Sequence, residues 1–262
     1  MKSHTPFYHR FSRLTGALLA GIFAFNATGC ELLEGGSEDP NELGGDPNIE
    51  LTEVGQRTTA SFNIPGNNPA FNNLDAEATV SENRNGIVTY DVEIGFDLEV
   101  VRAVDSMAGT STLPDAGKRA ILDLMLDRYG ATLDTTDPNN MKILAQVKLK
   151  VTDAGIQDFI TSEGNESQPF TIVKYDAEVG DEYTFNKDGN MIERRVVSRS
   201  TEDDYQVAFW LLKVIKVRET EENHPLIEEI VYVTNHKYGL VGIELKLKNG
   251  EEASAVLFPP TL

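Results

Sequence analysis

Apolar and polar residues alternate over much of the chain after about residue 51, and this period of two predicts β-strands. In the clearest alternation every second residue is apolar: Val88, Tyr90, Val92, Ile94 and Phe96. Asn85 and Gly86 come just before it, and this pair is typical of a tight turn. Residues 76–82 and 88–96 are therefore expected to form a hairpin.

The same alternation and similar turn signals continue to the end of the chain. Further strands are expected at residues 143–151, 170–175, 183–186, 191–200, 205–217, 227–235, 240–247 and 253–258. The segments Lys187-Asp188-Gly189 and Asn249-Gly250 are turn sequences between two pairs of them. Strands that follow one another through short turns predict an antiparallel meander.

Residues 114–129 have a helical pattern instead, with Thr112 as a possible cap and Gly130 at the end. Its apolar residues cover more than half of the circumference: Ala116, Ala120, Ile121, Leu122, Leu124, Met125, Leu126 and Tyr129. Two shorter helices are expected at residues 98–107 and 153–160. A curved sheet wrapping one or two helices would bury so wide an apolar surface. The predicted fold class is therefore α+β, mainly antiparallel β, with a half-barrel sheet.

Residues 205–217 (YQVAFWLLKVIKV) are apolar on both faces of the expected strand and include Trp210, the only tryptophan. A strand of this kind usually lies in the centre of a sheet that is covered on both sides. The helix can supply the second cover, and so can a bound apolar ligand.

The first 29 residues are ordered as an export signal. Lys2, Arg10 and Arg13 precede an apolar run at residues 14–25, and no acidic residue occurs before Glu31. The run is shorter than the roughly 20 residues needed to span a membrane. The arginines are not adjacent, so the general secretory route is favoured.

Ala27-Thr28-Gly29 before Cys30 resembles the lipobox of bacterial lipoproteins, although leucine is more usual in place of Ala27. The resemblance implies cleavage between Gly29 and Cys30 and acyl chains on Cys30 that hold the protein at a membrane. The alternative is ordinary signal-peptidase cleavage that leaves a free thiol. Glu31, rather than an aspartate, directly follows Cys30, and in this the chain resembles lipoproteins that leave the inner membrane. A lipid-anchored place in the cell envelope is expected, with the outer membrane favoured.

Residues 31–50 (ELLEGGSEDPNELGGDPNIE) contain seven acidic and no basic residues, two Gly-Gly pairs and two prolines. The few apolar side chains of this segment cannot offset the entropy that the chain would lose on ordering. A solvated tether is therefore expected. The predicted organisation is a signal peptide at 1–29, an acidic Gly/Pro-rich tether at 30–52 and a single β-rich domain at 53–262.

The charge balance limits the expected partners. The whole chain has 23 basic and 42 acidic residues, and without residues 1–29 its formal net charge is −22. Such a surface repels nucleic acid and anionic headgroups, so no nucleic-acid partner is predicted. Cys30 is the only cysteine, so no intrachain disulfide can form and the domain must be stabilised by its core.

Three stretches near the C-terminus resemble, in order, a pattern frequent in exported bacterial proteins: residues 179–185 (VGDEYTF), 205–217 and 232–245 (YVTNHKYGLVGIEL), followed by Asn249-Gly250. Those domains are similar to the half-barrels of periplasmic lipoprotein carriers and their outer-membrane receptors. The resemblance implies a strongly curved antiparallel sheet that wraps helices and leaves an apolar cavity. The chain departs from the pattern at residues 207–210.

No combination of residues predicts an enzyme. His224 and His236 are the only histidines after the signal, and their spacing does not indicate a zinc site. The chain has neither a Gly-x-Ser-x-Gly elbow nor a phosphate-binding loop. Residues 186–190 (NKDGN) offer too few oxygen ligands for calcium and are expected to form a hairpin turn. No catalytic residue, metal or cofactor is predicted.

Two functions remain open. In the first, the domain is a non-enzymatic binding module whose concave apolar face takes a lipid, an acyl chain or a lipoprotein. In the second, it is a structural or interaction lipoprotein whose core is filled by its own helix and whose protein partner meets an exposed surface. The cavity of the first would be lined by Leu124, Met125, Tyr129, Phe209, Trp210, Leu212 and Val214.

Overall fold

The computed structural model describes residues 41–64, 70, 74–107, 115–137, 139–187, 189–224 and 226–259. The first strands are β1 (Arg57–Asn63), β2 (Asp75–Arg84), β3 (Ile87–Phe96), β4 (Ala131–Asp134), β5 (Met141–Thr152), β6 (Gly155–Asp158) and β7 (Phe170–Lys174). They are followed by β8 (Glu182–Lys187), β9 (Asn190–Arg199), β10 (Tyr205–Val207), β11 (Trp210–Leu212), β12 (Ile215–Glu221), β13 (Ile227–Asn235), β14 (Gly239–Leu247) and β15 (Glu252–Phe258). The helical elements are the 3-10 helix η2 (Glu50–Thr52) and the helices α2 (Leu98–Met107) and α3 (Asp115–Arg128).

Most strands belong to one sheet, in the order β7-β6-β5-β3-β2-β1-β15-β14-β13-β12-β9-β8, with β4 paired to β5. β1 pairs with both β2 and β15 and so joins the N-terminal strands to the C-terminal ones. β10 and β11 form a separate two-stranded hairpin. All these pairings are antiparallel, so the prediction of a mainly antiparallel β fold is confirmed.

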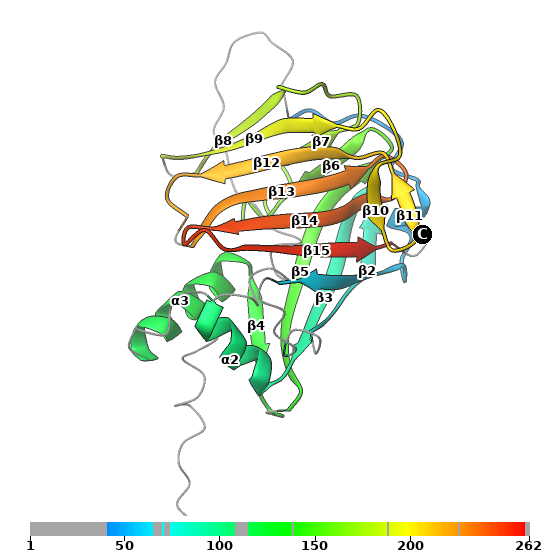
Figure 1. The fold of residues 1–262 in the computed structure, drawn as a ribbon. Coiled ribbons are helices and arrows are strands. Elements are labelled where there is room, and N and C mark those ends of the chain that lie inside the picture. Colours follow the sequence, from blue (N-terminus) through cyan, green and yellow to red (C-terminus); the bar gives the residue numbers. More distant parts are fainter. Residues whose placement is uncertain are drawn as a thin grey trace, which may run out of the picture.

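The sheet bends so strongly that it is nearly a closed barrel. In Figure 1, β9 and β12 to β15 run across the view while β3 and β5 run down behind them. The two end strands meet through their side chains, because the rings of Phe170 on β7 and Phe185 on β8 are 4.9 Å apart. The Lys174 N–H also lies 3.4 Å from the hydroxyl oxygen of Tyr183. One large apolar core fills the space that the sheet encloses.

Strand faces and turns agree with the sequence pattern in most places. The buried core positions of β3 are Val88, Val92, Ile94 and Phe96. Asn85 and Gly86 have φ angles of 54° and 87°, as the predicted turn between β2 and β3 requires. The predicted hairpins β8–β9 and β14–β15 are also confirmed.

Residues 205–217 do not form one central strand, so that prediction is wrong. The chain turns back at Ala208, whose φ is 51°, and divides into β10, β11 and the start of β12. Burial on both faces is found instead in other strands, among them β6 and the C-terminal part of β13, where residues 230–235 are all buried. The predicted helix at residues 153–160 is also wrong, because residues 155–158 form β6, which pairs with β5.

The helices α2 and α3 lie together at one end of the sheet, near β4 (Figure 1). In α3, Leu122 is buried, but Leu124 is 54% exposed and Ala116 and Ala120 are also exposed. The described side chains of α3 therefore do not form the wide buried face that the sequence predicted. Strand residues supply most of the core, so the sheet does not need this helix to fill it. No helix in the described part of the chain is long and apolar enough to cross a bilayer.

Residues 41–52, which the sequence assigned to the tether, lie on the domain, and we call them the docked arm. Leu43 is buried, and its carbonyl accepts a hydrogen bond from Lys150 Nζ at 2.7 Å. Thr52 is also buried, and Asn83 Nδ2 donates to its carbonyl at 2.9 Å. The domain therefore begins by residue 41 rather than at 53. Residues 1–40, which include the predicted signal peptide, Gly29 and Cys30, lie outside the described residues.

One glycine of the docked arm, Gly45, is suited to close packing. Gly45 has a φ of 92°, and a Cβ built there would lie 2.5 Å from Asp153 Oδ1. The same carboxylate oxygen accepts the Asp46 N–H at 2.7 Å. Only glycine combines this backbone angle with so close an approach. The Gly-rich composition indicated a solvated tether, but Gly45 instead lets the arm pack closely against the domain.

Candidate functional site

The β10–β11 hairpin ends in an apolar tip, which we define as Phe209, Trp210 and Leu211. Phe209 is 100% exposed, and Trp210 and Leu211 are each 57% exposed. The other exposed large apolar residues in the described part of the chain are scattered: Val54, Leu124, Leu144, Val179 and Met191. The apolar tip is thus a run of three consecutive apolar side chains on an acidic surface, where single exposed residues would be ordinary.

The base of the hairpin is packed on the outer face of the sheet. A small second core holds it and consists of Val207, Leu212, Val214, Val233 and Val241. Asn235 Nδ2 also donates to the Lys213 carbonyl at 2.8 Å and ties the end of β13 to the hairpin. Figure 1 shows β10 and β11 standing in front of the ends of β13 to β15. The apolar tip is therefore exposed on a base that the fold fixes.

The four hairpin residues predicted to line a ligand cavity do not line one together. Leu212 and Val214 are buried in the small core beneath the hairpin, whereas Phe209 and Trp210 project outward. The sequence located an apolar segment correctly, but it assigned the segment to the concave face of the sheet. That assignment is wrong because β10 and β11 leave the main sheet.

The helix residues predicted for the same cavity lie elsewhere. Leu124 and Tyr129 line a groove of about 600 Å³ that also includes residues from the loop after β6. The side chain of Met125 lies outside the described part. Two lysines of the groove are paired with carboxylates: Lys148 with Glu166 at 2.8 Å and Lys187 with Glu163 at 2.7 Å. The groove is thus a mixed polar surface rather than an apolar cavity.

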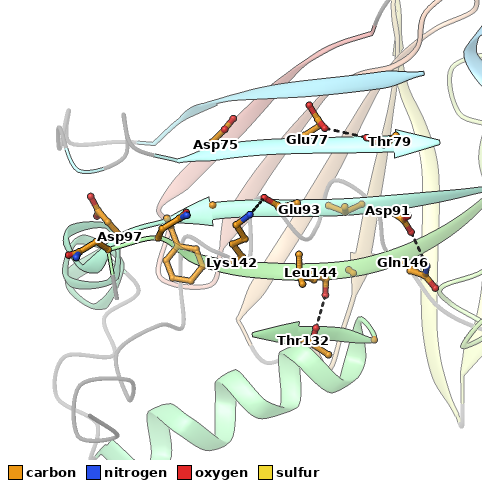
Figure 2. Close-up of a pocket in the computed structure, with 17 residues that line it drawn as sticks. Asp75, Glu77, Thr79, Asp91, Glu93, Asp97, Thr132, Lys142, Leu144 and Gln146 are labelled. Carbon is orange, nitrogen blue, oxygen red and sulfur yellow. Dashed lines mark hydrogen bonds and ion pairs between the residues drawn. The ribbon is translucent and has the colours of Figure 1, made fainter. Parts of the chain in front are cut away.

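A larger groove of about 1000 Å³ involves β2, β3 and β5 (Figure 2). Five carboxylates are among its lining residues: Asp75, Glu77, Asp91, Glu93 and Asp97. Lys142 Nζ lies 2.5 Å from Glu93 Oε1, and Gln146 donates to Asp91 Oδ1 at 2.8 Å. Asp97 Oδ1 accepts the N–H groups of two residues at the start of α2, and so caps that helix. Most of these polar groups therefore serve one another or the fold.

The interior contains a buried ionic cluster of Asp158, Arg194, Glu219 and Tyr232. Arg194 Nη1 lies 2.7 Å from Asp158 Oδ2, and Arg194 Nε donates to Glu219 Oε2 at 2.7 Å. Tyr232 donates its hydroxyl to Glu219 Oε2 at 3.0 Å. The side chains of Arg194 and Asp158 are 0% and 1% exposed. This cluster joins β6 of the first part of the sheet to β9, β12 and β13 of the second.

Aromatic rings complete the surroundings of Arg194. Its guanidinium carbon lies 4.0 Å from the centre of the Phe170 ring and 5.2 Å from that of Tyr232. Burial opposes the charge of Arg194, but Asp158 and Glu219 outweigh it and raise the arginine pKa. Burial also raises the pKa of Glu219, although Arg194 partly opposes that shift. The cluster lies at the contact between the two parts of the sheet and is closed to solvent.

His224 is also buried, and it is held as a neutral ring. Its Nδ1 accepts the N–H of Ile227 at 2.8 Å, and its Nε2 lies 3.5 Å from the Tyr129 hydroxyl. Burial lowers the pKa of His224 to about 3, with smaller contributions from Arg128 and Lys248. Because its ring nitrogens serve contacts within the protein, His224 acts as a structural link between the residue that follows α3 and the start of β13.

The buried ionic cluster was not predicted from the sequence, although the sequence contains a signal for it. Arg194 occupies an inward position of β9 between Ile192 and Val196, and Glu219 follows Val217 in the same phase on β12. The two residues are register partners in the β9–β12 pairing. On each strand the charged residue stands where the alternation calls for an apolar one. Opposite charges at such positions on two strands could have indicated an internal ion pair.

Comparisons with known proteins do not establish a family for the chain. No family model matches it, and no curated protein matches it significantly. Among solved structures, it is similar to a protein from Bacteroides fragilis, provisionally described as exported and having a YmcC-like fold, with 8% identity and a TM-score of 0.38 over 79% of this chain and 95% of that one. It is also similar to a provisionally described lipoprotein from Parabacteroides distasonis, with 10% identity and a TM-score of 0.36 over 79% and 94%.

Proposed function

We propose that this chain is an exported lipoprotein, anchored by acyl chains on Cys30, whose domain is a non-enzymatic contact module with a self-filled core. The domain works at the cell envelope through an exposed surface, with the outer membrane favoured. A carrier that holds a lipid inside the sheet is the alternative.

The filled interior is the observation that carries this choice. Phe170, Arg194 and Tyr232 are all at most 1% exposed at the point where the two parts of the sheet meet. An acyl chain in the same space would have to displace these side chains and separate Arg194 from its carboxylates. Breaking a buried ion pair in this way costs several kcal/mol. The two grooves outside the core have mixed linings with several charged side chains, which suit an acyl chain poorly.

The export signal and Cys30 support the anchoring part of the proposal. Two or more acyl chains hold a protein stably at a membrane, whereas the acidic surface offers no attraction to anionic headgroups. Metabolic labelling with an alkyne-bearing acyl chain is expected to mark the full chain, and Cys30→Ser is expected to abolish the mark. Label that persists in Cys30→Ser would contradict lipidation at this residue.

The self-filled core is tested with residues 31–262, which include the docked arm and every other described residue. Native mass spectrometry is expected to show the mass of the chain alone, and a fluorescent fatty acid is expected not to bind saturably. Lipid that co-purifies and raises the unfolding temperature would favour the carrier instead.

A further inference from the structure

We propose that the apolar tip inserts into the interfacial region of the membrane to which the protein is anchored. This inference rests on the proposed lipid anchor and names the surface that the domain uses. It assigns a lipid surface, rather than a protein, as the occupant of Phe209, Trp210 and Leu211.

The chemistry of the tip fits a bilayer interface. Phe209 and Leu211 offer apolar side chains, and Trp210 combines a large apolar ring with one N–H donor, a combination enriched at the headgroup level of membranes. Residues 205–212 contain no charged side chain, although a quarter of the residues of the chain are charged. Burying the tip in lipid would therefore remove apolar surface from water without burying a charge.

The shape of the tip also favours lipid. It is a projection whose turn residue, Ala208, is exposed together with the next three residues, so the tip can enter a lipid layer without moving the sheet. The small core beneath it is closed, with Val207 0% and Leu212 8% exposed. The fold thus holds the tip out from the sheet at no further ordering cost.

The docked arm, which continues toward the anchor, contacts the end of the sheet that carries the base of the hairpin. Leu51 of the docked arm packs against the β13–β14 turn, because a Cβ built at Gly239 would lie 3.3 Å from Leu51 Cδ1. The start of the same turn is tied to the hairpin by the bond from Asn235 to the Lys213 carbonyl. Cys30 precedes Asn41 by 11 residues, which extend to at most about 40 Å. An anchored protein can therefore bring this end of the sheet to the membrane.

The charges around the tip indicate which lipids it suits. Glu202, Asp203 and Asp204 are exposed before β10, and Lys213 is exposed after β11. The excess of negative charge disfavours anionic headgroups, so a zwitterionic surface is the better partner. Insertion is expected to depend on the apolar side chains and only weakly on salt.

The single tryptophan makes the test direct, because Trp210 is the only one in the chain. The lipidated protein is purified from membranes and reconstituted into phosphatidylcholine vesicles, with or without bromine on the acyl chains. The expected result is a blue shift of Trp210 emission, quenching by the brominated lipid and protection from acrylamide. Trp210 that stays fully accessible to acrylamide while the protein is vesicle-bound would overturn the proposal.

A double variant and a matched control define the surface. Phe209→Ser with Leu211→Ser is expected to reduce the quenching by brominated lipid, and circular dichroism is expected to show an unchanged fold. Val179→Ser removes a side chain that is 60% exposed on the turn before β8, and it is expected to change nothing. Equal quenching in the double variant and the control would contradict insertion of the tip.

Failure of the anchor and failure of the tip give different results. If the wild-type protein does not float with vesicles, anchoring fails, and the Cys30→Ser chain at high vesicle concentration then tests the tip alone. Its vesicle binding is expected to fall roughly tenfold or more when Phe209 and Leu211 become serine. Absence of that fall would overturn the proposal. Photo-crosslinking of residue 209 to a protein, without any quenching of Trp210 by brominated lipid, would also overturn it and would assign the tip to a protein partner.

Discussion

The buried ionic cluster and the apolar tip are opposite exceptions to the usual distribution of residues between the inside and the surface. Arg194 is fully buried with two carboxylates, whereas Phe209 is fully exposed. The charges in the cluster are met by opposite charges, hydrogen bonds and rings from several strands. The tip side chains project beyond the small core that holds the hairpin. A buried charge that is paired in this way becomes part of the core, and an exposed apolar group on a fixed base is available to another molecule.

The largest expected effect is the loss of Arg194. Arg194→Ala leaves Asp158 and Glu219 buried without their cation, so the free energy of unfolding is expected to fall by about 3–5 kcal/mol. Denaturant unfolding measures the change. Arg195→Ala is the control, because the neighbouring arginine has a side chain that is 42% exposed, and a loss below about 1 kcal/mol is expected. Similar losses of unfolding free energy in the two variants would show that the buried cluster contributes no more than an exposed arginine.

Two adjacent leucines on β11 separate the base of the hairpin from its tip. Leu212 is 8% exposed and Leu211 is 57% exposed. Leu212→Ala is expected to lower the free energy of unfolding by about 2–3 kcal/mol through loss of packing. Leu211→Ala is expected to change it by less than about 0.5 kcal/mol. A large loss from Leu211→Ala in urea unfolding would show that the tip belongs to the core.

The docked arm near the tip offers a matched pair of glycines. Gly45→Ala places a Cβ against Asp153 at a positive φ, so a loss of about 1–3 kcal/mol is expected. A Cβ at Gly44 meets no atom within 4 Å, so Gly44→Ala is expected to be nearly neutral. The unfolding temperature measures both. Equal behaviour of the two variants would indicate that the arm does not hold this position in solution.

A pH dependence from His224 is the effect that accumulates gradually, over several pH units. Its folded-state pKa of about 3 lies below the ordinary value of 6.5, so the unfolded chain binds more protons between these values. Stability from this group is present above about pH 6.5 and is lost as pH falls toward 3, by at most about 1.4 kcal/mol per pH unit. Because the raised pKa of Glu219 acts in the opposite direction, the measured quantity is the difference from His224→Asn.

The comparison between wild type and His224→Asn is made by urea unfolding at several pH values. His224→Asn is expected to flatten the slope between about pH 6 and 4, where the folded and unfolded states differ in protonation. His236→Asn changes an exposed histidine on the turn after β13 and is expected to keep the wild-type slope. An unchanged slope in His224→Asn would contradict the neutral buried state of this ring.

Sequence alone determined the features that depend on neighbours along the chain. The period of two predicted β3 and its turn at Asn85-Gly86, because pleating and turn geometry are local properties. The same local logic predicted α2 and α3, and it gave the export signal and the lipobox-like segment before Cys30. Cys30 lies outside the described residues, so its lipidation stays a prediction.

Only the tertiary structure decided where apolar and charged residues end up. The run from Tyr205 to Val217 predicts one buried strand by pattern, but the turn at Ala208 and the patch of Val233 and Val241 convert it into a hairpin with an exposed tip. The docked arm has the composition of a tether, yet the surface around Asp153 fits Gly45. Arg194 meets Asp158 only because the sheet bends until β9 faces β6, across 36 residues of sequence. Contacts of that range depend on sheet curvature, which local patterning does not specify.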